Sequence, residues 1–386
     1  MNWFETLIRA SGFAGLSWQN AVMFTVGGGL IYLAIKKHYE PLLLIPIGFG
    51  AVLANLPDAM LSASPDPSGA IDPHGLPPLM QMVYDVGIRT EFLPPLIFLG
   101  VGALTDFRPL IRRPLTFLLG AAAQLGIFMA ALAAFYIFDF SMPEAASIGI
   151  IGGADGPTSI FLTAILAPHL LGAVAVAAYS YMSLVPIIQP PIIRLLTTPR
   201  ERKMPMPEAK PASTTAVILF PIVTGVLASL AIPTCAPLIG LLMFGNLLRE
   251  SGVTDRLSKA AGGSLINITT IFLGLVVGST MTGQNFLNPQ TLFILLLGAV
   301  AFAFSTAGGV IFAKALNLVL PAHRRINPCI GAAGVSAVPM AARVVQNFVS
   351  RQSDGKVNPL MAAMGPNVAG VVGSAVAAGV FLTLLR

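Results

Sequence analysis

Charged residues are scarce in this sequence. Only 10% of its 386 residues are Asp, Glu, Lys or Arg, whereas 55% are hydrophobic. Soluble domains contain about 25% charged residues, so this composition excludes a soluble globular protein and predicts an all-α polytopic membrane protein. The net charge of +6 lies mostly in short loops, where it indicates membrane topology and not nucleic-acid binding.

Residues that commonly build catalytic or metal centres are also few. The two cysteines, Cys235 and Cys329, lie in apolar stretches without metal-ligand spacing, and the four histidines lie in loops. The sequence contains no Walker loop, dinucleotide-binding glycine fingerprint or triad spacing. These absences argue against a histidine-based metal site and against nucleotide-driven chemistry.

Glycine (38) and proline (31) are abundant, which is typical of transporters with broken helices. The sequence Gly-Ile-Ile-Gly-Gly-Ala-Asp-Gly-Pro-Thr-Ser at residues 149–159 places Asp155 inside an apolar segment. An acid at membrane depth costs about 3 kcal/mol, so it indicates an ion or proton site. The carboxylate, freed backbone carbonyls and the hydroxyls of Thr158 and Ser159 suit a small hard cation. The alternative is a kinked helix in which Asp155 is only a cap, although a buried cap would still need its charge balanced.

The loop charges predict where the chain crosses the membrane. Two apolar stretches, 145–166 and 171–193, separate an acidic outer link from the basic loop 194–210, so only one of them can cross fully. We therefore expect the Asp155 stretch to be a re-entrant hairpin or broken helix that enters from outside. Residues 328–349 lie between two basic loops and are expected to enter from the cytoplasm.

Short motifs recur at nearly constant offsets of 174, 178 and 179 residues. They are Ile97-Phe-Leu-Gly100 with Ile271-Phe-Leu-Gly274, Phe117-Leu-Leu-Gly120 with Leu295-Leu-Leu-Gly298, and Ile151-Gly-Gly-Ala154 with Ile330-Gly-Ala-Ala333. Because matched segments have opposite orientations, they predict an inverted-topology repeat whose hairpins meet near the midplane. Chance similarity among glycine-rich apolar segments is the alternative. The expected divisions are an amphipathic segment (1–20), a first half (21–193), a cytoplasmic linker (194–213) and a second half (214–386).

The second hairpin replaces the acid with neutral oxygens and adds a base. Asn327 and Ser336 suit sodium or water, and Arg343 suits a carboxylate through a bidentate fork. Arg343 could instead neutralise Asp155 or extend to the cytoplasmic surface. Tyr181 and Asn367 need polar partners at membrane depth, which suits a functional role. Alternatively, Tyr181 is a residue of the interfacial aromatic belt and Asn367 forms a hydrogen bond between helices.

Several long motifs together resemble one known family. They are the segments 149–158 and 177–182 (Ala-Ala-Tyr-Ser-Tyr-Met), then 185–191 (Val-Pro-Ile-Ile-Gln-Pro-Pro), 244–253, 330–344 and 364–370 (Met-Gly-Pro-Asn-Val-Ala-Gly). In this order they resemble the beta subunit of sodium-pumping biotin-dependent decarboxylases, from about Glu40 onward. The outer loop at 57–90 is shorter than in oxaloacetate-specific members, which favours a methylmalonyl-CoA, glutaconyl-CoA or malonate type of enzyme.

The resemblance implies a function that composition alone does not. A partner subunit would transfer a carboxyl group to biotin, and decarboxylation of carboxybiotin at the cytoplasmic side would drive Na+ outward while consuming a proton. Expected partners are biotin-carrier and carboxyltransferase subunits and a small membrane subunit, with a homo-oligomer possible, in a bacterial or archaeal plasma membrane. A secondary Na+-coupled transporter and a passive membrane anchor are the alternatives. Arg343 beside a sodium-type site favours the pump, and Asp155 disfavours the anchor.

The resemblance also implies roles for single residues. Asp155 would be the main sodium ligand, with help from Asn327, and Arg343 would engage carboxybiotin. Tyr181 and Ser336 would serve a second sodium site or the proton path. Gly331 would allow a close approach of the backbone, and Asn367 would line the sodium pathway.

Overall fold

The computed structural model describes residues 11–57, 61, 79–206, 210–321 and 324–386. All regular elements in this part of the chain are helices, and seven of them are long and apolar enough to cross a membrane. The expectation of an all-α polytopic membrane protein is therefore confirmed. Of the predicted amphipathic segment 1–20, residues 1–10 lie outside the described residues, and helix α2 already begins at Trp18.

The long helices are separated by shorter ones. The seven candidate spans are α2 (Trp18–Lys37), α7 with α8 (Thr116–Ala123 and Leu125–Phe138), η3 with α11 (Pro168–Leu170 and Leu171–Leu196), α13 (Thr214–Ala231), α15 through η5 to α16 (Asp255–Ala260, Ala261–Leu265 and Ile266–Ser279), α18 (Pro289–Val319) and α20 (Leu360–Leu385). The remaining main elements are α3 (Pro41–Ala54), α4 (Leu79–Tyr84), η1 (Asp85–Arg89), α5 (Leu93–Leu104), α6 (Arg108–Arg112), α9 (Met142–Gly149), η2 (Ile150–Gly153), α10 (Gly156–Leu166), α12 (Pro199–Arg202), η4 (Pro233–Cys235), α14 (Ala236–Glu250), α17 (Gly283–Phe286), η7 (Pro328–Gly334) and α19 (Met340–Gln352). The segment from α4 to α5 bends by 63° and also has the composition of one span.

Polar caps show why these apolar runs begin where they do. Ser213 accepts a hydrogen bond from the amide of Ala216 at the start of α13, and Asn288 caps α18 ahead of Pro289. Such side chains satisfy amides that have no partner inside the helix, and each is worth about 1 kcal/mol. The caps place helix starts at the ends of the apolar runs.

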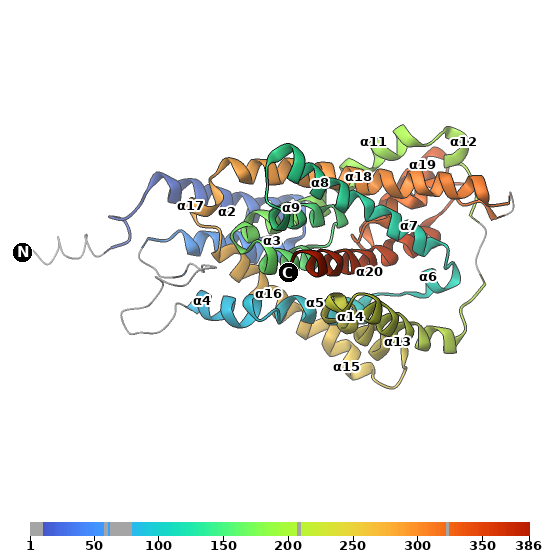
Figure 1. Ribbon diagram of the computed structural model, residues 1–386, viewed down its shortest axis with the longest axis horizontal. Helices are drawn as coiled ribbons and strands as arrows, with labels where there is room; N and C mark the ends of the chain where they lie inside the picture. The colour runs from blue at the N-terminus through green and yellow to red at the C-terminus, as the bar shows by residue number, and fades with distance from the viewer. Residues whose placement is uncertain (1–10, 58–60, 62–78, 207–209, 322–323) are drawn as a thin grey trace, which may run out of the picture.

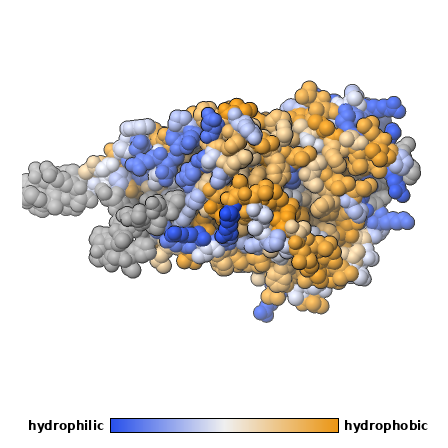
Figure 2. Space-filling model, viewed as in Figure 1, coloured by the Kyte–Doolittle hydropathy of each residue, from blue (hydrophilic) through white to orange (hydrophobic). Residues whose placement is uncertain are grey.

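The helices form an elongated bundle with an apolar middle. Figure 1 shows α20 at the centre of the view, with α7 and α18 on one side and α13, α14 and α15 on the other. Large apolar side chains face outward on the surface helices, for example Leu230 of α13, which is 75% exposed. Figure 2 shows a broad hydrophobic zone over the middle and hydrophilic residues toward both ends, as expected for a protein surrounded by lipid.

Two helix pairs, α3 with α16 and α14 with α5, approach each other closely at glycines. A Cβ on Gly50 would lie 2.3 Å from the carbonyl oxygen of Leu275, and one on Gly245 would lie 2.0 Å from that of Leu99. In the reverse direction, Gly278 meets Ile47 and Gly102 meets Leu242, at 2.1 and 1.9 Å. Small residues allow such close approach of helices in membranes.

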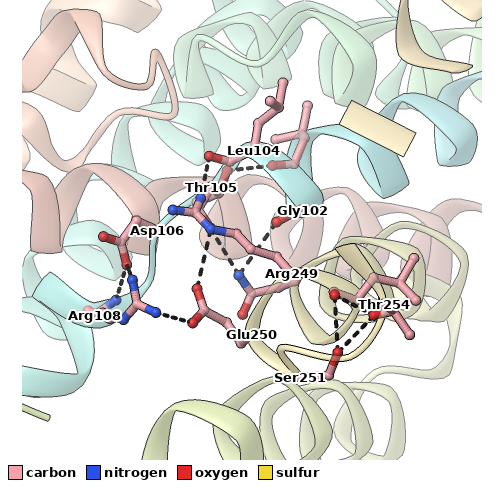
Figure 3. A network of polar contacts seen from close by, with 12 residues as sticks. Gly102, Leu104, Thr105, Asp106, Arg108, Arg249, Glu250, Ser251 and Thr254 are labelled. Atoms are coloured by element: carbon pink, nitrogen blue, oxygen red, sulfur yellow. Dashed lines mark hydrogen bonds and ion pairs between the residues drawn. The ribbon is translucent and has the colours of Figure 1, made fainter. Parts of the chain in front are cut away.

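The ends of these pairs are joined by polar side chains. The Asn55 amide donates to the carbonyl of Met281 (2.7 Å) beyond α16, and the Asn246 amide donates to that of Thr105 (2.9 Å) beyond α5. Figure 3 shows the second of these ends, where Arg249 also donates to the Leu104 carbonyl and Arg108 pairs with Glu250 at 2.5 Å. The last carbonyls of a helix have no partner within it, so these side chains complete the ends of α5 and α16.

Candidate functional site

Asp155 lies at a break between two short helices. The chain runs through α9 and the 3-10 turn η2, takes a left-handed conformation at Ala154 (φ 53°), and restarts as α10. Asp155 caps α10, because its Oδ1 accepts a hydrogen bond from the Thr158 amide at 3.3 Å. Pro157 in the first turn has no amide hydrogen to satisfy, so it suits this position.

The cap is only part of the environment of Asp155. Its Oδ2 accepts hydrogen bonds from the Ser374 hydroxyl of α20 at 2.6 Å and from the Ser336 hydroxyl, just after η7, at 2.9 Å. The Ser336 amide also donates to the Gly153 carbonyl at 2.8 Å. The turn at Asp155 is therefore bonded directly to the turn after η7, 181 residues further along the chain.

Asp155 is a buried acid without a cationic partner in the described residues. Its exposed fraction is 6%, and no lysine, arginine or histidine there lies within ion-pair distance of it. Hydroxyl donors alone leave a net negative charge in a low-dielectric setting, and such charges are costly. A mobile cation or a proton would balance it.

Buried oxygens without hydrogen-bond partners lie on the segments around this acid. They include Gln124 Oε1, Thr158 Oγ1 and Asn367 Oδ1. The Gln124 amide nitrogen donates to Gly334 (3.2 Å) and that of Asn367 donates to Val335 (2.7 Å), so both side chains contact the η7 turn. Buried polar atoms are usually satisfied, so such orphans call for an explanation.

The donor set fits a hard cation. Carboxylate, amide and hydroxyl oxygens are the ligands that such ions prefer. Transition metals favour Cys and His clusters, and in the described part of the chain no three His, Cys, Asp or Glu side chains are placed to hold a metal. The residues present therefore suit a small hard cation.

A tyrosine packs against the same turn. A Cβ on Gly156 would lie 2.0 Å from Cε1 and 2.7 Å from the hydroxyl of Tyr179, and this buried hydroxyl has no hydrogen-bond partner. The sequence singled out Tyr181, whose hydroxyl instead donates to the Leu295 carbonyl of α18. The tyrosine beside Asp155 is therefore Tyr179.

The other predicted residues lie at varying places. Asn327 caps η7 through Cys329 (3.0 Å), and its amide nitrogen donates to linker carbonyls at Met204 (3.0 Å) and Arg202 (3.3 Å). A Cβ on Gly331 would lie 2.1 Å from the Gly309 carbonyl oxygen, so the two backbones touch there.

Arg343 lies on the exposed face of α19. Neither an acid nor a hydrogen-bond acceptor in the described residues engages its side chain. Of the predicted residues, the structure brings Asp155, Ser336 and Asn367 together at the junction of the two turns, while Asn327, Tyr181 and Arg343 have other surroundings.

Besides Tyr179, two site residues were missed from the sequence. Ser374 follows Asn367 by seven residues, two helical turns, which places both on one face of α20. Gln124 is a single amide inside an apolar span. A polar residue at membrane depth was the available signal in each case.

Fold and site together define a class: a multi-pass membrane protein with a buried acid where two broken segments from different halves of the chain meet. Residues 19–385 match the family model described as "Na+-transporting oxaloacetate decarboxylase beta subunit". The chain belongs to this family, which confirms the resemblance seen in the sequence.

Relatives with three different names cover nearly the whole chain. The glutaconyl-CoA decarboxylase subunit beta of Acidaminococcus fermentans is 52% identical over 380 residues, covering 98% of this chain and 97% of that protein. The methylmalonyl-CoA decarboxylase subunit beta of Propionigenium modestum is 53% identical over 391 residues, 97% of each. The oxaloacetate decarboxylase beta chain 2 of Salmonella typhimurium is 49% identical over 426 residues, 98% of each.

Proposed function

We propose that this chain is the membrane subunit of a decarboxylase sodium pump. It decarboxylates carboxybiotin presented by a partner subunit and couples this reaction to outward Na+ transport, with consumption of a proton. The observation that supports this most is the buried carboxylate of Asp155, held by Ser336 and Ser374 without a described cationic partner.

The transport path lies in a fold built as an inverted repeat. Its two halves, 21–193 and 214–386, are joined by a cytoplasmic linker at 194–213. The glycine contacts of α3 with α16 and of α14 with α5 support the repeat. In the repeat α3 corresponds to α14 and α16 to α5, so the two helix pairs are equivalent. The α9–α10 and η7–α19 segments are its two hairpins, and the Ser336–Asp155 hydrogen bond supports their meeting. Ion sites in such folds lie near the midplane, at the repeat interface.

Sodium can bind without breaking the hydrogen bonds at Asp155. Each serine hydroxyl has one hydrogen and two lone pairs, so Ser336 and Ser374 can donate to the carboxylate while a lone pair of each oxygen faces the ion. The carboxylate, these hydroxyls and the unpaired oxygens of Thr158 and Asn367 then serve as ligands. Sodium thereby neutralises the charge of Asp155, which lowers the cost of moving the site through the membrane.

The chemical step takes place near Arg343 on the cytoplasmic side. The bond between the ureido nitrogen and the carboxyl carbon breaks, CO2 leaves, and the nitrogen takes up a proton. Arg343 binds the carboxylate beforehand. The difference in binding between the carboxylated and free cofactor shifts the core that carries both hairpins toward an outward-open state.

Partners would be a biotin-carrier subunit, a carboxyltransferase subunit and a small membrane subunit, in a bacterial or archaeal plasma membrane. The alignment with the oxaloacetate decarboxylase chain spans 426 positions, whereas those with the glutaconyl-CoA and methylmalonyl-CoA relatives span 380 and 391. This difference supports a CoA-thioester or malonate donor over oxaloacetate.

A liposome experiment tests the pump against the alternative, a secondary Na+-coupled transporter. The purified chain is given free carboxybiotin, with Na+ inside or outside, and decarboxylation and 22Na+ flux are measured for wild type and Asp155→Asn. The pump predicts that both activities depend on Na+ and that both vanish in the variant. Sodium flux that is indifferent to carboxybiotin would refute the pump and support the transporter.

A further inference from the structure

A small pocket opens between the cytoplasmic ends of α11 and α19. It has a volume of about 280 Å³, and its lining includes the polar residues Arg194, Asn347 and Arg351 and the apolar residues Pro190 and Phe348. Figure 2 shows hydrophilic residues gathered at the end of the molecule where α12 and α19 lie in Figure 1. The lining of the pocket therefore combines positive charge with apolar side chains.

Both arginines are free to bind an anion. Arg194 and Arg351 are exposed, each lies in the last turn of its helix, and no acid in the described residues forms an ion pair with either. Cytoplasmic loops of membrane proteins are basic in any case. That rule explains each arginine separately but not their convergence on one concave site, where like charges repel.

A buried arginine, Arg202, contacts residues of both helices that line the pocket. Arg202 donates from Nη2 to the carbonyls of Thr197 (2.5 Å) and Arg194 (2.6 Å) and from Nη1 to Gln352 Oε1 (3.3 Å). Its guanidinium also lies 5.7 Å from the ring centre of Phe348. Arg202 thus ties the end of α11 to α19, so the spacing between the walls is set by the fold.

Arg343 lies on the same side of α19 as the polar residues that line the pocket. Asn347 precedes Arg351 by four residues, and Arg343 precedes Asn347 by four, so all three lie on one side of the helix. Each step is roughly 6 Å along the axis, which places Arg343 roughly 12 Å deeper than Arg351.

We propose that this pocket is where the carboxylated ring of carboxybiotin first binds, with Arg194 and Arg351 holding its carboxylate before it moves on to Arg343. This inference rests on the proposed function. Guanidinium groups match a carboxylate in shape and charge, and Phe348 and Pro190 offer apolar surface to the rings. The volume lies near the lower limit of about 300 Å³ for ligand sites, which suits the ring system and excludes a whole CoA thioester. The carboxyl group stays on the ring here, so no bond is broken at this site.

The test measures the kinetics of free carboxybiotin decarboxylation in proteoliposomes at saturating Na+. The substrate is carboxybiotin esterified with methanol at its side-chain carboxyl group, so the carboxylate on the ring is its only anionic group. For Arg194→Gln and Arg351→Gln we expect KM to rise about tenfold, the factor that corresponds to about 1.4 kcal/mol. The maximal rate and the Na+ concentration for half-maximal rate stay unchanged. Arg194→Lys and Arg351→Lys keep the charge and restore much of the affinity, with a steeper dependence on salt.

Arg200→Gln is the matched control, because it removes one exposed cytoplasmic charge from α12, outside this pocket. Its KM should equal that of wild type. An unchanged KM in both pocket variants would overturn the proposal, and so would a loss seen only with the complete complex, which would assign the arginines to an acidic surface of a partner. Should wild type itself show no sodium-dependent decarboxylation, the proposed function fails and this inference with it.

Discussion

Replacing Ser374 by alanine tests a site residue that was found only in the structure. The hydroxyl donates to Asp155 Oδ2 at 2.6 Å, within the short range of charge-assisted hydrogen bonds. Hydrogen bonds to charged groups contribute about 1.5–3 kcal/mol, which corresponds to about 10- to 150-fold in an equilibrium constant. The hydroxyl favours the charged form of Asp155 that sodium needs, and its oxygen can also turn toward the ion. Both effects have the same sign, so Ser374→Ala should raise the Na+ concentration for half-maximal decarboxylation by about tenfold or more.

The assay is the initial rate of carboxybiotin decarboxylation against Na+ concentration, at fixed pH and saturating carboxybiotin. Ser374→Thr keeps the hydroxyl and should stay close to wild type. Thr383→Ala is the control on the same helix, since among the described residues Thr383 bonds only to Gly379 and Thr234, near the end of α20. An unchanged sodium dependence in Ser374→Ala, beside an inactive Asp155→Asn, would show that Ser374 is not part of the sodium site.

Three further predictions concern other parts of the molecule. Gly245→Ala should lower the free energy of unfolding by about 1–3 kcal/mol, because its Cβ would meet the Leu99 carbonyl oxygen. Gly240 has open space around it, so Gly240→Ala should not lower this free energy. Thermal unfolding in detergent compares the two variants. Gln124→Leu removes an unpaired oxygen and the hydrogen bond to Gly334, so sodium affinity should fall by about tenfold while KM for carboxybiotin holds; a normal sodium titration would count against Gln124 as a ligand. Burial tends to raise the pKa of Glu201, but hydrogen bonds from Thr198 and the nearby Lys314 lower it on balance below its ordinary value of 4.5. Glu201 therefore stabilises the fold above that value, and this contribution is lost as pH falls through the lowered pKa; Glu201→Gln should flatten the acid limb of the stability profile, and an unaltered limb would contradict this.

The sequence could predict those site residues that are energetically unfavourable in an apolar segment. Asp155 stands out because an acid in an apolar segment needs a reason, and the surrounding glycines and proline predict the break that the structure shows between η2 and α10. Ser336 was reached through the repeat, which aligned the two hairpin turns. The structure joins these turns through Ser336 and Gly153.

Ser374 and Gln124 could not be placed in the same way. Helix α20 consists of apolar and small residues on nearly every side, so its sequence does not show which face is turned toward Asp155. Helix rotation is set by packing against neighbours such as α7 and η7. A serine on such a helix can equally bond to its own backbone, and Ser374 does so as well, through the Val371 carbonyl.

Asn327 illustrates an ambiguity of residue type. An amide at membrane depth suits sodium, but Asn before Pro is also a favoured way to begin a helix, and here its Oδ1 caps η7. Its nitrogen holds the carbonyls of Arg202 and Met204 in the linker. A role in sodium binding remains a prediction for Asn327, and the contacts seen here place it between the linker and η7.

The linker contacts connect the two ends of the proposed reaction. The Arg202 side chain fixes the wall of the carboxylate pocket, and its backbone carbonyl accepts from Asn327 at the start of η7. Helix η7 is buried throughout and leads directly to Ser336, which bonds to Asp155. A continuous set of contacts therefore joins the cytoplasmic pocket to the buried acid through one short helix. Because packed interiors move between discrete arrangements and do not deform smoothly, a shift of this helix would alter both places together.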